Sequence, residues 1–455
     1  GRCRSSMVRS TAQGRGRAAG RARVAARRER AVSSSDSIAG AGISILEEHE
    51  STGAPLDGML SRYIRSRRLG PAPREELNEL VLGVTRCRGR LDWRLRNVGV
   101  MPSPRTRLLA DHVLSGRSFM EVGFPITAAE RSWLRTLTPP LEVPSMEEQA
   151  RLECPDWAWD CFRATFGDER VGIELSALRD PAPLDLRVNT LKTSRQAALA
   201  ALHATGLDAK PTPYSPLGIR MSQRVPLSQI AGLKEGFVDI QDEGSQLLAQ
   251  LVGAAPGEFV VDFCAGSGGK TLALAAEMAN CGRLVALDID PKRLGRGAAR
   301  CTKAGVSNVQ RRTIIPQVDT DAEPDLWLKR QKRRVTRVLV DAPCSGVGAW
   351  RRNPDARWMR CGLGLDELLP LQAAVLSRAA RLVKPNGTLV YATCSMLKQE
   401  NEHQVLAFLK NHPEFRLQSP QLTFNGPIDP DGFMRLSPAK HGCDGFFGAL
   451  LTRSH

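Results

Sequence analysis

The stretch FVVDFCAGSGGKT, residues 259–271, decides the fold class of this chain. Its apolar start is typical of a buried strand, and a helical pattern follows Lys270. Between them, glycines allow the backbone to turn tightly and to approach a ligand, which the N-terminus of the following helix would face. The loop fits neither the Walker A pattern nor a clean G-x-G-x-x-G pattern. By itself it therefore predicts a ligand site without naming the ligand.

The same rhythm of strands and helices continues from Glu258 onwards. Residues 282–305 predict a strand, an acidic turn and a helix, residues 335–346 a strand with an exposed end, and residues 371–395 a helix, a turn and a strand. Strands that alternate with helices predict an α/β fold with a Rossmann-like, doubly wound and mainly parallel sheet. Ligands of such a sheet gather at the C-terminal ends of its strands.

An acid at the end of the second predicted strand narrows the class of ligand. Asp288 closes the apolar run that follows the glycine loop. A carboxylate in this place can accept hydrogen bonds from the hydroxyls of a ribose. Together with the glycine loop it predicts a ligand that contains adenosine, for which NAD and S-adenosylmethionine both qualify.

Two cysteines stand at the ends of two further predicted strands. LVDAPCSG places Asp341 and Cys344 at one strand end, and VYATCS places Cys394 at another. A single cysteine at a strand end is more often a packed core residue, since free cysteine is among the most buried residue types. Two such thiols and an acid on the ligand edge favour a reactive site.

Methylation of cytosine at C5 requires groups of this kind. The ring carbon becomes nucleophilic enough only when a thiolate adds at C6, which is covalent catalysis. A free thiol has a pKa of about 8.5, so the site must favour the thiolate. An acid near N3 of the ring can supply a proton or a hydrogen bond, and a second thiol can assist release of the product.

Four motifs in order resemble one family. FVVDFCAGSGGKT, ALDIDPKRL, LVDAPCSGVGAWRRNPDARW and LVYATCSMLKQENE resemble the Sun/RsmB and NOL/NOP family of RNA cytosine-5 methyltransferases, including its bacterial 16S ribosomal RNA members. LRVNTLK at 186–192 and VDIQDEGSQL at 238–247 resemble the segments that precede its catalytic domain. The resemblance covers residues 183–455 strongly and residues 43–182 loosely.

The resemblance implies a role for each motif residue. Cys394 would be the nucleophile, Cys344 would help to release the product, and Asp341 would lie beside the base and the reactive end of the cofactor. S-adenosylmethionine would be the cofactor, with its ribose on Asp288. The glycine loop would wrap it with Cys264, Ala265, Gly266, Ser267, Gly268, Gly269 and Lys270.

The chain departs from the family near the adenine site. Family members carry an acid after the third strand, whereas residues 308–319 are apolar at the expected position. Asp319 or Asp321 could substitute through a shifted loop. Recognition of the adenine is therefore open.

Basic residues near the motifs predict contacts with RNA. Arg351 and Arg352 follow the Pro-Cys motif, where Trp350 and Trp358 offer faces on which bases could stack. The alternative is a structural loop with packed tryptophans. The predicted small α+β unit resembles an RNA-recognition module and adds three RNA-binding candidates, Arg187, Asn189 and Lys192.

The whole chain divides into four predicted segments. Residues 1–42 are predicted to be disordered and basic, because the first thirty residues hold ten arginines and one acid. Residues 43–140 predict a helical RNA-binding domain, similar to NusB. Residues 141–235 predict a linker helix and the α+β unit, and residues 236–455 the catalytic domain. The first segment has the composition of an organelle transit peptide, or of a basic arm that touches RNA.

Composition bounds the remaining properties. The net charge of +16 fits a polyanionic partner. The eleven cysteines form no C-x-x-C pair, so neither a metal site nor a disulfide framework is expected. No apolar run predicts a membrane span. We expect a monomer, in the cytoplasm of a bacterium or, with a transit peptide, in a mitochondrion or chloroplast.

These observations predict an RNA cytosine-5 methyltransferase, with ribosomal RNA favoured as the substrate. A transfer RNA enzyme is the first alternative. A weakly active, methyltransferase-like assembly factor that binds RNA is the second, because the adenine-site acid is missing. An NAD-dependent dehydrogenase is disfavoured, since the paired cysteines have no place in it and no histidine or tyrosine is set to handle a hydride.

Overall fold

The computed structural model describes residues 37–118, 121, 123–223, 225–316, 325–358, 363–420, 422 and 426–454. The chain divides into two compact units, with the boundary between Glu147 and Glu148. The second unit contains both the segment predicted as an α+β unit and the segment predicted as the catalytic domain. The predicted transit peptide or basic arm lies outside the described residues up to residue 36.

The first unit is helical. Apolar residues at helical spacing on α4, among them Leu77, Val81 and Val84, are buried in its core. They pack against buried leucines of the neighbouring helices, such as Leu91 and Leu95. The helices are α2 (Ile38–Thr52), α3 (Leu56–Arg67), α4 (Pro71–Arg86), α5 (Arg88–Asn97), α6 (Pro104–Leu114) and α7 (Ala128–Leu134).

The predicted start of order at residue 43 is wrong by several residues. Ser37 caps the first described helix, since its Oγ accepts a hydrogen bond from the backbone N–H of Gly40 at 3.0 Å. The helix begins at Ile38, and residues 40–43 are buried in the core. Glycine and alanine gave residues 38–42 the composition of the basic segment, although they pack as a helix. No helix in the described part of the chain is long and apolar enough to cross a membrane.

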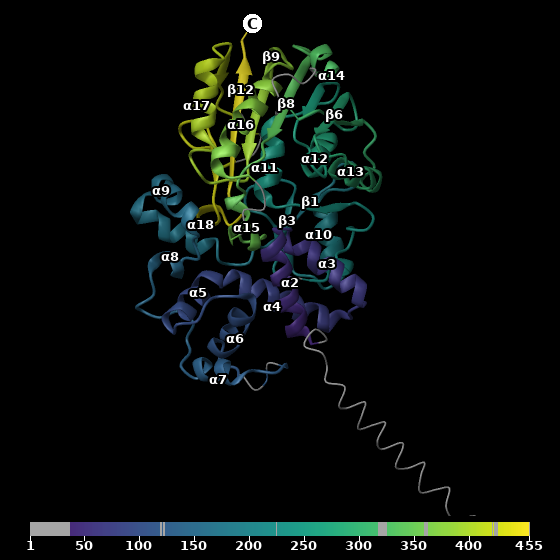
Figure 1. Ribbon diagram of the computed structural model, residues 1–455. Coiled ribbons are helices and arrows are strands. Elements are labelled where there is room, and N and C mark those ends of the chain that lie inside the picture. Colours follow the sequence, from purple (N-terminus) through teal and green to yellow (C-terminus); the bar gives the residue numbers. More distant parts are fainter. Residues whose placement is uncertain are drawn as a thin grey trace, which may run out of the picture. The chain divides into compact units, whose positions relative to one another are not determined.

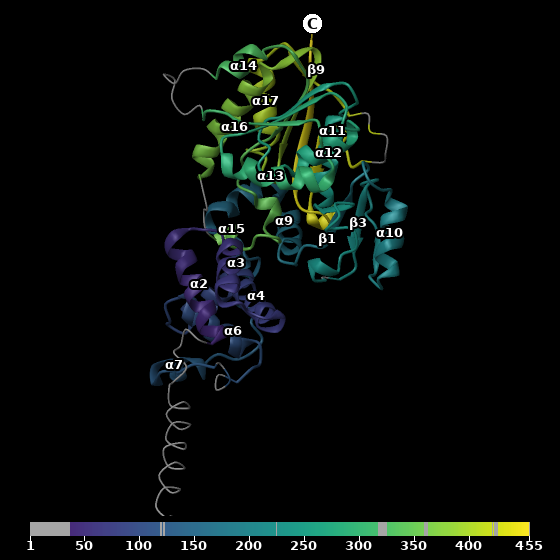
Figure 2. The ribbon, with the colours of Figure 1, turned by 90° about the vertical axis from the view of Figure 1, so that its right-hand side faces the viewer.

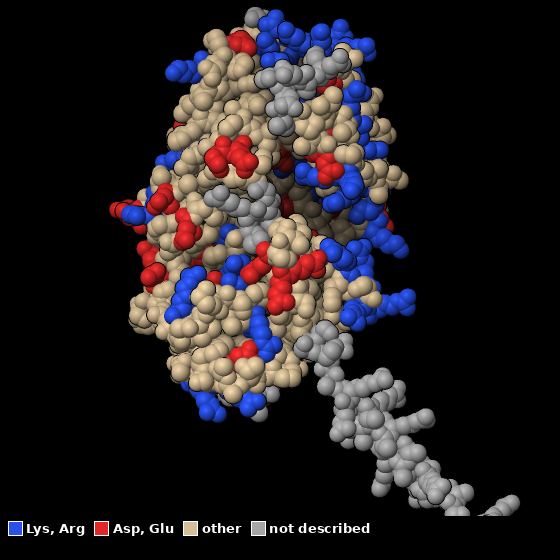
Figure 3. Space-filling view, viewed as in Figure 1, with Lys and Arg blue, Asp and Glu red and all other residues tan. Residues whose placement is uncertain are grey.

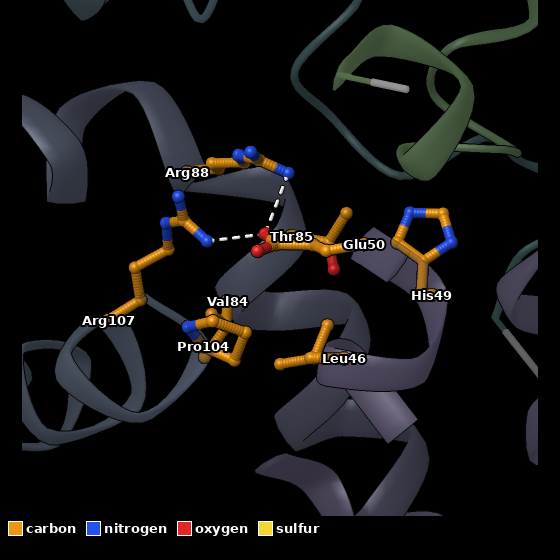
Figure 4. A pocket seen from close by; sticks show the side chains of 8 residues that line it. All are labelled: Leu46, His49, Glu50, Val84, Thr85, Arg88, Pro104 and Arg107. Atoms are coloured by element: carbon orange, nitrogen blue, oxygen red, sulfur yellow. Dashed lines mark hydrogen bonds and ion pairs between the residues drawn. The ribbon is translucent and has the colours of Figure 1, made fainter. Parts of the chain in front are cut away.

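A small pocket lies among the helices of this first unit (Figure 4). Arg88 and Arg107 point toward Glu50 there, and their N–O distances to its carboxylate are 3.0 Å and 2.5 Å. Arg107 also pairs with Asp92 at 2.5 Å. Because the two guanidinium groups are balanced by carboxylates, the pocket reads as an internal ion-pair cluster of the helical unit and not as a site for an anion.

The second unit begins with helices α8 (Glu148–Arg151) and α9 (Asp156–Ala177), followed by a small antiparallel sheet. Its strand order is β2-β3-β1-β4, and buried apolar residues of β1, β3 and α10 form its core. The elements are β1 (Leu184–Val188), α10 (Arg195–Ala204), β2 (Ala209–Pro211), β3 (Gly218–Met221), the 3-10 helix Leu227–Gln229 and β4 (Val238–Ile240).

The large sheet of this unit has the predicted α/β architecture (Figure 1). Its strand order is β10-β12-β9-β8-β5-β6-β7, with β11 paired to β12. The five strands from β9 to β7 are parallel, while β12 and β10 add antiparallel pairs at one edge. Its strands are β5 (Phe259–Asp262), β6 (Arg283–Asp288), β7 (Val309–Thr313), β8 (Val335–Asp341), β9 (Val383–Thr393), β10 (Phe415–Leu417), β11 (Met434–Leu436) and β12 (Phe446–Arg453).

Helices cover both faces of the large sheet (Figure 2). Successive strand residues point to opposite faces, so Val338 packs with α16 and α17 while Leu339 packs with α11 and α12. The helices are α11 (Glu243–Val252), α12 (Gly269–Glu277), α13 (Pro291–Ala304), α14 (Leu326–Arg330), the 3-10 helix Val347–Ala349, α15 (Asp355–Trp358), α16 (Leu365–Ala380), α17 (Glu402–Asn411) and α18 (Pro438–His441). This arrangement brings the C-terminal ends of β5, β6, β8 and β9 to one edge.

Candidate active site

The glycine loop between β5 and α12 has the conformation that its sequence predicts. Gly266 and Gly268 have φ values of +55° and +84°, in the region that glycine adopts without steric cost. A Cβ on Gly266 would lie 2.6 Å from Nη2 of Arg293, the end of a flexible and exposed side chain that would have to move. The loop therefore presents bare backbone at the ligand edge.

Asp288 joins the end of β6 to this loop. Its Oδ2 accepts a hydrogen bond from the N–H of Gly266 at 2.8 Å, and its Oδ1 accepts one from the N–H of Asp290 at 2.9 Å. The carboxylate is buried at the sheet edge. It is thereby held in a single orientation beside the glycine loop.

Buried groups behind the loop are shifted toward their neutral forms. Burial raises the pKa of Asp262 to about 7, although its Oδ2 accepts a hydrogen bond from Thr271 at 2.6 Å. Burial and the nearby carboxylates raise the pKa of the Cys264 thiol. A raised pKa favours the neutral form of this thiol, which is a weaker nucleophile than the thiolate.

Lys270 and Asp341 form an ion pair between α12 and the end of β8. Nζ of Lys270 lies 2.7 Å from Oδ2 of Asp341. Burial opposes the charge on Lys270, but Asp341 and then Cys394 raise its pKa above the ordinary value. Lys270 is thus a cation held at the strand ends as the partner of Asp341. The sequence predicted it only as part of the cofactor loop.

The two predicted cysteines meet at the same edge. Sγ of Cys344, just after β8, lies 3.3 Å from Sγ of Cys394, just after β9. Both thiols are only partly buried. The hydrogen bond to Cys394 and burial raise the pKa of Cys344 well above its ordinary value. The two sulfur atoms lie within hydrogen-bonding distance of each other, and either can be the donor.

Comparisons with known proteins identify the family of the chain. The family described as 16S rRNA methyltransferase RsmB/F matches residues 249–452, and the domain described as RsmF/B-like, ferredoxin-like matches residues 154–228. A protein of Synechocystis sp. named "Probable ribosomal RNA small subunit methyltransferase B" is 30% identical over 433 residues, which cover 88% of this chain and 95% of that protein.

The chain belongs to the RsmB/F family of 16S rRNA methyltransferases. It is thus an enzyme that methylates RNA with S-adenosylmethionine as its cofactor, and the predicted family, fold class and cofactor are confirmed.

Solved structures agree with the fold. A methyltransferase homologue from Pyrococcus horikoshii has 27% identity and a TM-score of 0.57, covering 69% of this chain and 100% of that chain. NSun6 from the same organism, solved with SFG, has 21% identity and a TM-score of 0.59, covering 67% and 100%. This second likeness shows the fold alone.

Two residues predicted to bind RNA in this RsmB/F chain are buried, and that prediction is wrong for both. Arg187 is 4% exposed, and its Nη1 donates to the carbonyl oxygen of Gly269 at 2.8 Å and to Oε1 of Gln241. Asn189 is 5% exposed and donates to the carbonyl oxygens of Gly236 and Ala304, each at 2.8 Å. These side chains link the small sheet to the catalytic fold.

Arg187 instead supports the glycine loop, together with Arg300 of α13. Nη1 of Arg300 donates to the carbonyl oxygen of Ser267 at 3.1 Å, while its Nη2 pairs with Asp239 of β4 at 2.5 Å. Two carbonyl groups of the loop are thus held by guanidinium groups that the small sheet helps to orient. The sequence signal for this role was weak, because both arginines lie in basic segments that resemble a surface.

The arginines after the Pro-Cys motif, Arg351 and Arg352, also form ion pairs within the protein. Arg351 is 5% exposed and pairs with Asp444 at 2.7 Å, so its predicted RNA contact is wrong. Arg352 is partly exposed, but its guanidinium lies 2.5 Å from Asp444 and 2.6 Å from Asp242. The two guanidinium groups and the two carboxylates balance each other, so the cluster has no net positive charge that would attract a phosphate.

Trp350 has a structural role, the alternative to base stacking. Its side chain is 0% exposed and packs edge-on against Trp157, with ring centroids 5.9 Å apart. Phe162 contacts its ring from α9 at 5.5 Å. Trp358 lies partly buried at the end of α15. A base therefore has no access to Trp350.

Exposed cations in the described part of the catalytic unit gather elsewhere. Figure 3 shows Lys and Arg side chains in the region of α13. The exposed cations of this helix include Lys292, Arg293 and Arg296. Lys192 is also exposed, and its Nζ donates to the carbonyl oxygens of Glu235 and Lys303. RNA contact by Lys192 remains a prediction.

The described residues just after β7 lack the acid that was expected near the adenine. Ile314, which is buried, and Ile315, which is exposed, follow β7 where an acid was expected, and Asp319 and Asp321 lie outside the described residues. Among the described residues, no group of His, Cys, Asp or Glu could hold a metal ion.

The acids of QENE, residues 399–402, are typical of a helix start because they suit the positive N-terminal end of a helix. The helix α17 begins only at Glu402. Glu400 and Asn401 are instead buried beneath the two cysteine loops. Sequence reasoning missed them because an acid before a helix resembles an ordinary helix start.

Proposed function

We propose that this chain methylates C5 of a cytosine in small-subunit ribosomal RNA through a transient covalent bond between Cys394 and C6. The observation that carries the proposal is the pair of sulfur atoms 3.3 Å apart beside the Lys270–Asp341 ion pair. An N- or O-methyltransferase needs no thiol, whereas attack at C5 requires a nucleophile at C6. The substrate class follows the names of the relatives.

The residues around the glycine loop fit S-adenosylmethionine. Gly266 and Gly268 leave space at the backbone, and each oxygen of Asp288 accepts one backbone N–H. A carboxylate can accept about four hydrogen bonds, so Asp288 keeps capacity for two ribose hydroxyls. Residues 264–270 would line the remainder of the cofactor. When bound, S-adenosylmethionine supplies an electrophilic methyl group.

Cys394 acts first in this mechanism. Its thiolate forms a bond to C6 of the cytosine, and the ring electrons shift so that C5 becomes nucleophilic and takes the methyl group. The cation of Lys270 interacts electrostatically with Cys394, so a positive charge acts on the attacking sulfur. The target base must leave its stack to reach this sulfur.

Asp341 and Lys270 then control charge at the base. Asp341 is partly exposed at the end of β8, so one face of its carboxylate is open to a ligand. A hydrogen bond from the base to this carboxylate would orient the ring. The ammonium of Lys270 is a proton donor held in place by Asp341, and it can stabilise negative charge on the ring during C6 addition.

Cys344 acts last. After transfer, the proton on C5 passes to water, the electrons of the C5–H bond restore the C5–C6 double bond, and the C6–S bond breaks with its electron pair on the sulfur of Cys394. Cys344, as the neighbouring thiol, can give its proton to that departing sulfur. A transfer RNA substrate remains an alternative, because the cation-rich face of α13 would fit the phosphates of either RNA.

The test combines labelled S-adenosylmethionine, small-subunit ribosomal RNA and total transfer RNA, with mapping of methylated cytosines. The proposal expects label on ribosomal RNA at C5. Cys344→Ala should accumulate a covalent protein–RNA adduct, and Cys394→Ala should abolish both adduct and turnover. A Cys394→Ala enzyme that still methylates C5 would overturn the mechanism, and label on transfer RNA alone would change the substrate.

A further inference from the structure

Glu400 is a buried carboxylate between the two cysteine loops. Its side chain is 0% exposed in the turn that precedes α17. The hydroxyl of Tyr391, on β9, donates to its backbone carbonyl oxygen at 2.7 Å. A carboxylate so deep in the fold is costly unless its oxygens are satisfied by donors.

Both oxygens of Glu400 accept two hydrogen bonds each. Oε1 accepts from the backbone N–H of Ser345 at 2.8 Å and from Nε2 of Gln372 at 3.0 Å. Oε2 accepts from the hydroxyl of Ser345 at 2.5 Å and from the hydroxyl of Ser395. Gln372 also donates to the carbonyl oxygen of Pro343 at 3.0 Å.

Three of the four donors belong to the residues that follow the two thiols. Ser345 comes directly after Cys344, and Ser395 comes directly after Cys394. Neighbouring Cα atoms are about 3.8 Å apart, so fixing each serine fixes the backbone of its cysteine. A single carboxylate therefore holds both ends of the thiol pair.

The backbone supplies a second connection between the same loops. The N–H of Gly348 donates to the carbonyl oxygen of Cys394 at 3.0 Å, and the N–H of Gly445 donates to the carbonyl oxygen of Gly348 at 2.9 Å. A Cβ on Gly348 would lie 2.0 Å from the carbonyl oxygen of Gly445. This close packing restricts both cysteine loops. The side chain of Glu400 therefore adjusts the positions of the two cysteines only over a small range.

We infer that Glu400 is a positioning residue. Through Ser345 it orients Cys344 for release of the product, and through Ser395 it orients Cys394 for formation of the adduct. The inference rests on the proposed function. Glu400 touches neither base nor cofactor; it acts through the serines. Its negative charge also contributes to the raised pKa of Cys344, after the hydrogen bond to Cys394 and burial.

The two serines allow the inference to be tested one thiol at a time. Ser395→Ala removes the link to the nucleophile, so we expect the adduct to form about 10- to 100-fold more slowly, as for loss of a hydrogen bond to a charged group. Ser345→Ala removes the hydroxyl link to the second thiol, so we expect normal adduct formation and slower release. Single-turnover kinetics with full-length ribosomal RNA transcript, in wild-type and Cys344→Ala backgrounds, resolve the two steps.

Two further variants separate positioning from stability. Ser215→Ala removes a buried hydroxyl that donates to Gln246 at 2.8 Å in the small sheet, and it serves as the matched control with normal rates. Glu400→Gln should slow both steps, because an amide cannot accept at both of its polar atoms. If Glu400→Gln fails to fold, the serine variants alone decide.

Each outcome has a separate meaning. A split between slow formation in Ser395→Ala and slow release in Ser345→Ala supports the inference. Wild-type rates in both serine variants, with only a lower melting temperature, would make Glu400 a purely structural residue. Failure of the proposed function would look different, since Cys344→Ala with wild-type serines would then trap no adduct.

Discussion

The cysteine loops and the arginine-rich segments of the catalytic unit resemble each other in sequence, since both are polar and both adjoin motifs. In the structure they differ. Cys344 and Cys394 remain partly accessible at the ligand edge, whereas Arg187 and Arg351 are buried and paired inside the protein. The difference teaches that position at a strand end predicts chemistry better than charge does.

The physical reason lies in how each side chain is satisfied. A thiol makes weak hydrogen bonds and can stay at an open edge without a partner. A guanidinium group offers five donors, so it is well suited to hold several carbonyl or carboxylate oxygens together. Arg187 uses this capacity on the glycine loop, and Arg352 uses it between two acids. Charge in the sequence therefore does not reveal which side faces RNA.

The largest expected effect concerns Lys270, at the accessible strand ends where the two cysteines lie. Lys270→Ala removes the cation that interacts with Cys394 and can stabilise charge on the base, so we expect turnover to fall about 10²- to 10³-fold, as for loss of one electrostatic donor. Lys332, an exposed lysine before β8, provides the control Lys332→Ala with unchanged turnover. Methyl transfer under single-turnover conditions measures both. An active Lys270→Ala enzyme would remove Lys270 from the mechanism.

A second prediction tests whether the buried arginines hold the fold. Arg351→Ala leaves Asp444 without one buried partner, so we expect the free energy of unfolding to fall by about 3–5 kcal/mol. The matched exposed variant Arg296→Ala should change it by less than about 0.5 kcal/mol. In RNA binding the pattern should reverse, with the salt dependence reduced only in Arg296→Ala. The opposite pattern would restore Arg351 as an RNA ligand.

A third prediction concerns the cofactor side of the same edge. Asp288→Ala removes the acceptor beside the glycine loop, so we expect S-adenosylmethionine to bind about 10- to 100-fold more weakly. Asp288→Asn keeps one acceptor oxygen and should lose less. Isothermal titration calorimetry measures both affinities, and RNA affinity should stay constant. Equal cofactor affinity in all three proteins would place the ribose elsewhere.

A fourth prediction concerns a buried acid behind the loop. Because the pKa of Asp262 is raised to about 7 in the folded protein, the folded state holds a proton that the unfolded state loses near pH 4. Stability from this group therefore falls as the pH rises from about 4 to about 7, by at most about 1.4 kcal/mol per pH unit. Asp262→Asn should flatten this part of the profile in chemical denaturation. An unchanged slope would contradict the raised pKa.

The sequence predicted the catalytic sheet well because strand ends in a parallel sheet converge. The glycine loop, Asp288, Asp341 and both cysteines lie on separate segments, yet the alternation of strands and helices was sufficient to place them together. Exposure was harder to predict. Arg187 and Arg351 lie within polar segments, and only tertiary contacts decide that they face inward.

The role of Glu400 lay beyond prediction for a related reason. An acid two residues before a helix is ordinarily a favourable helix start. Its four donors come from two loops and from α16, which are distant in sequence. Nothing in the local pattern indicates that these segments converge. The start of α2 was missed similarly, because its first turn has the small residues of the preceding segment.

The covalent mechanism is tested most directly by the intact mass of the protein after incubation with S-adenosylmethionine and the ribosomal RNA transcript, digested to a short oligonucleotide. For Cys344→Ala we predict a species heavier than the protein by one methylated RNA fragment, attached to the peptide that contains Cys394. Cys394→Ala should show no such species. An adduct on Cys344 in the Cys394→Ala protein would reverse the two roles, and methylated RNA without any adduct or dependence on Cys394 would contradict the mechanism.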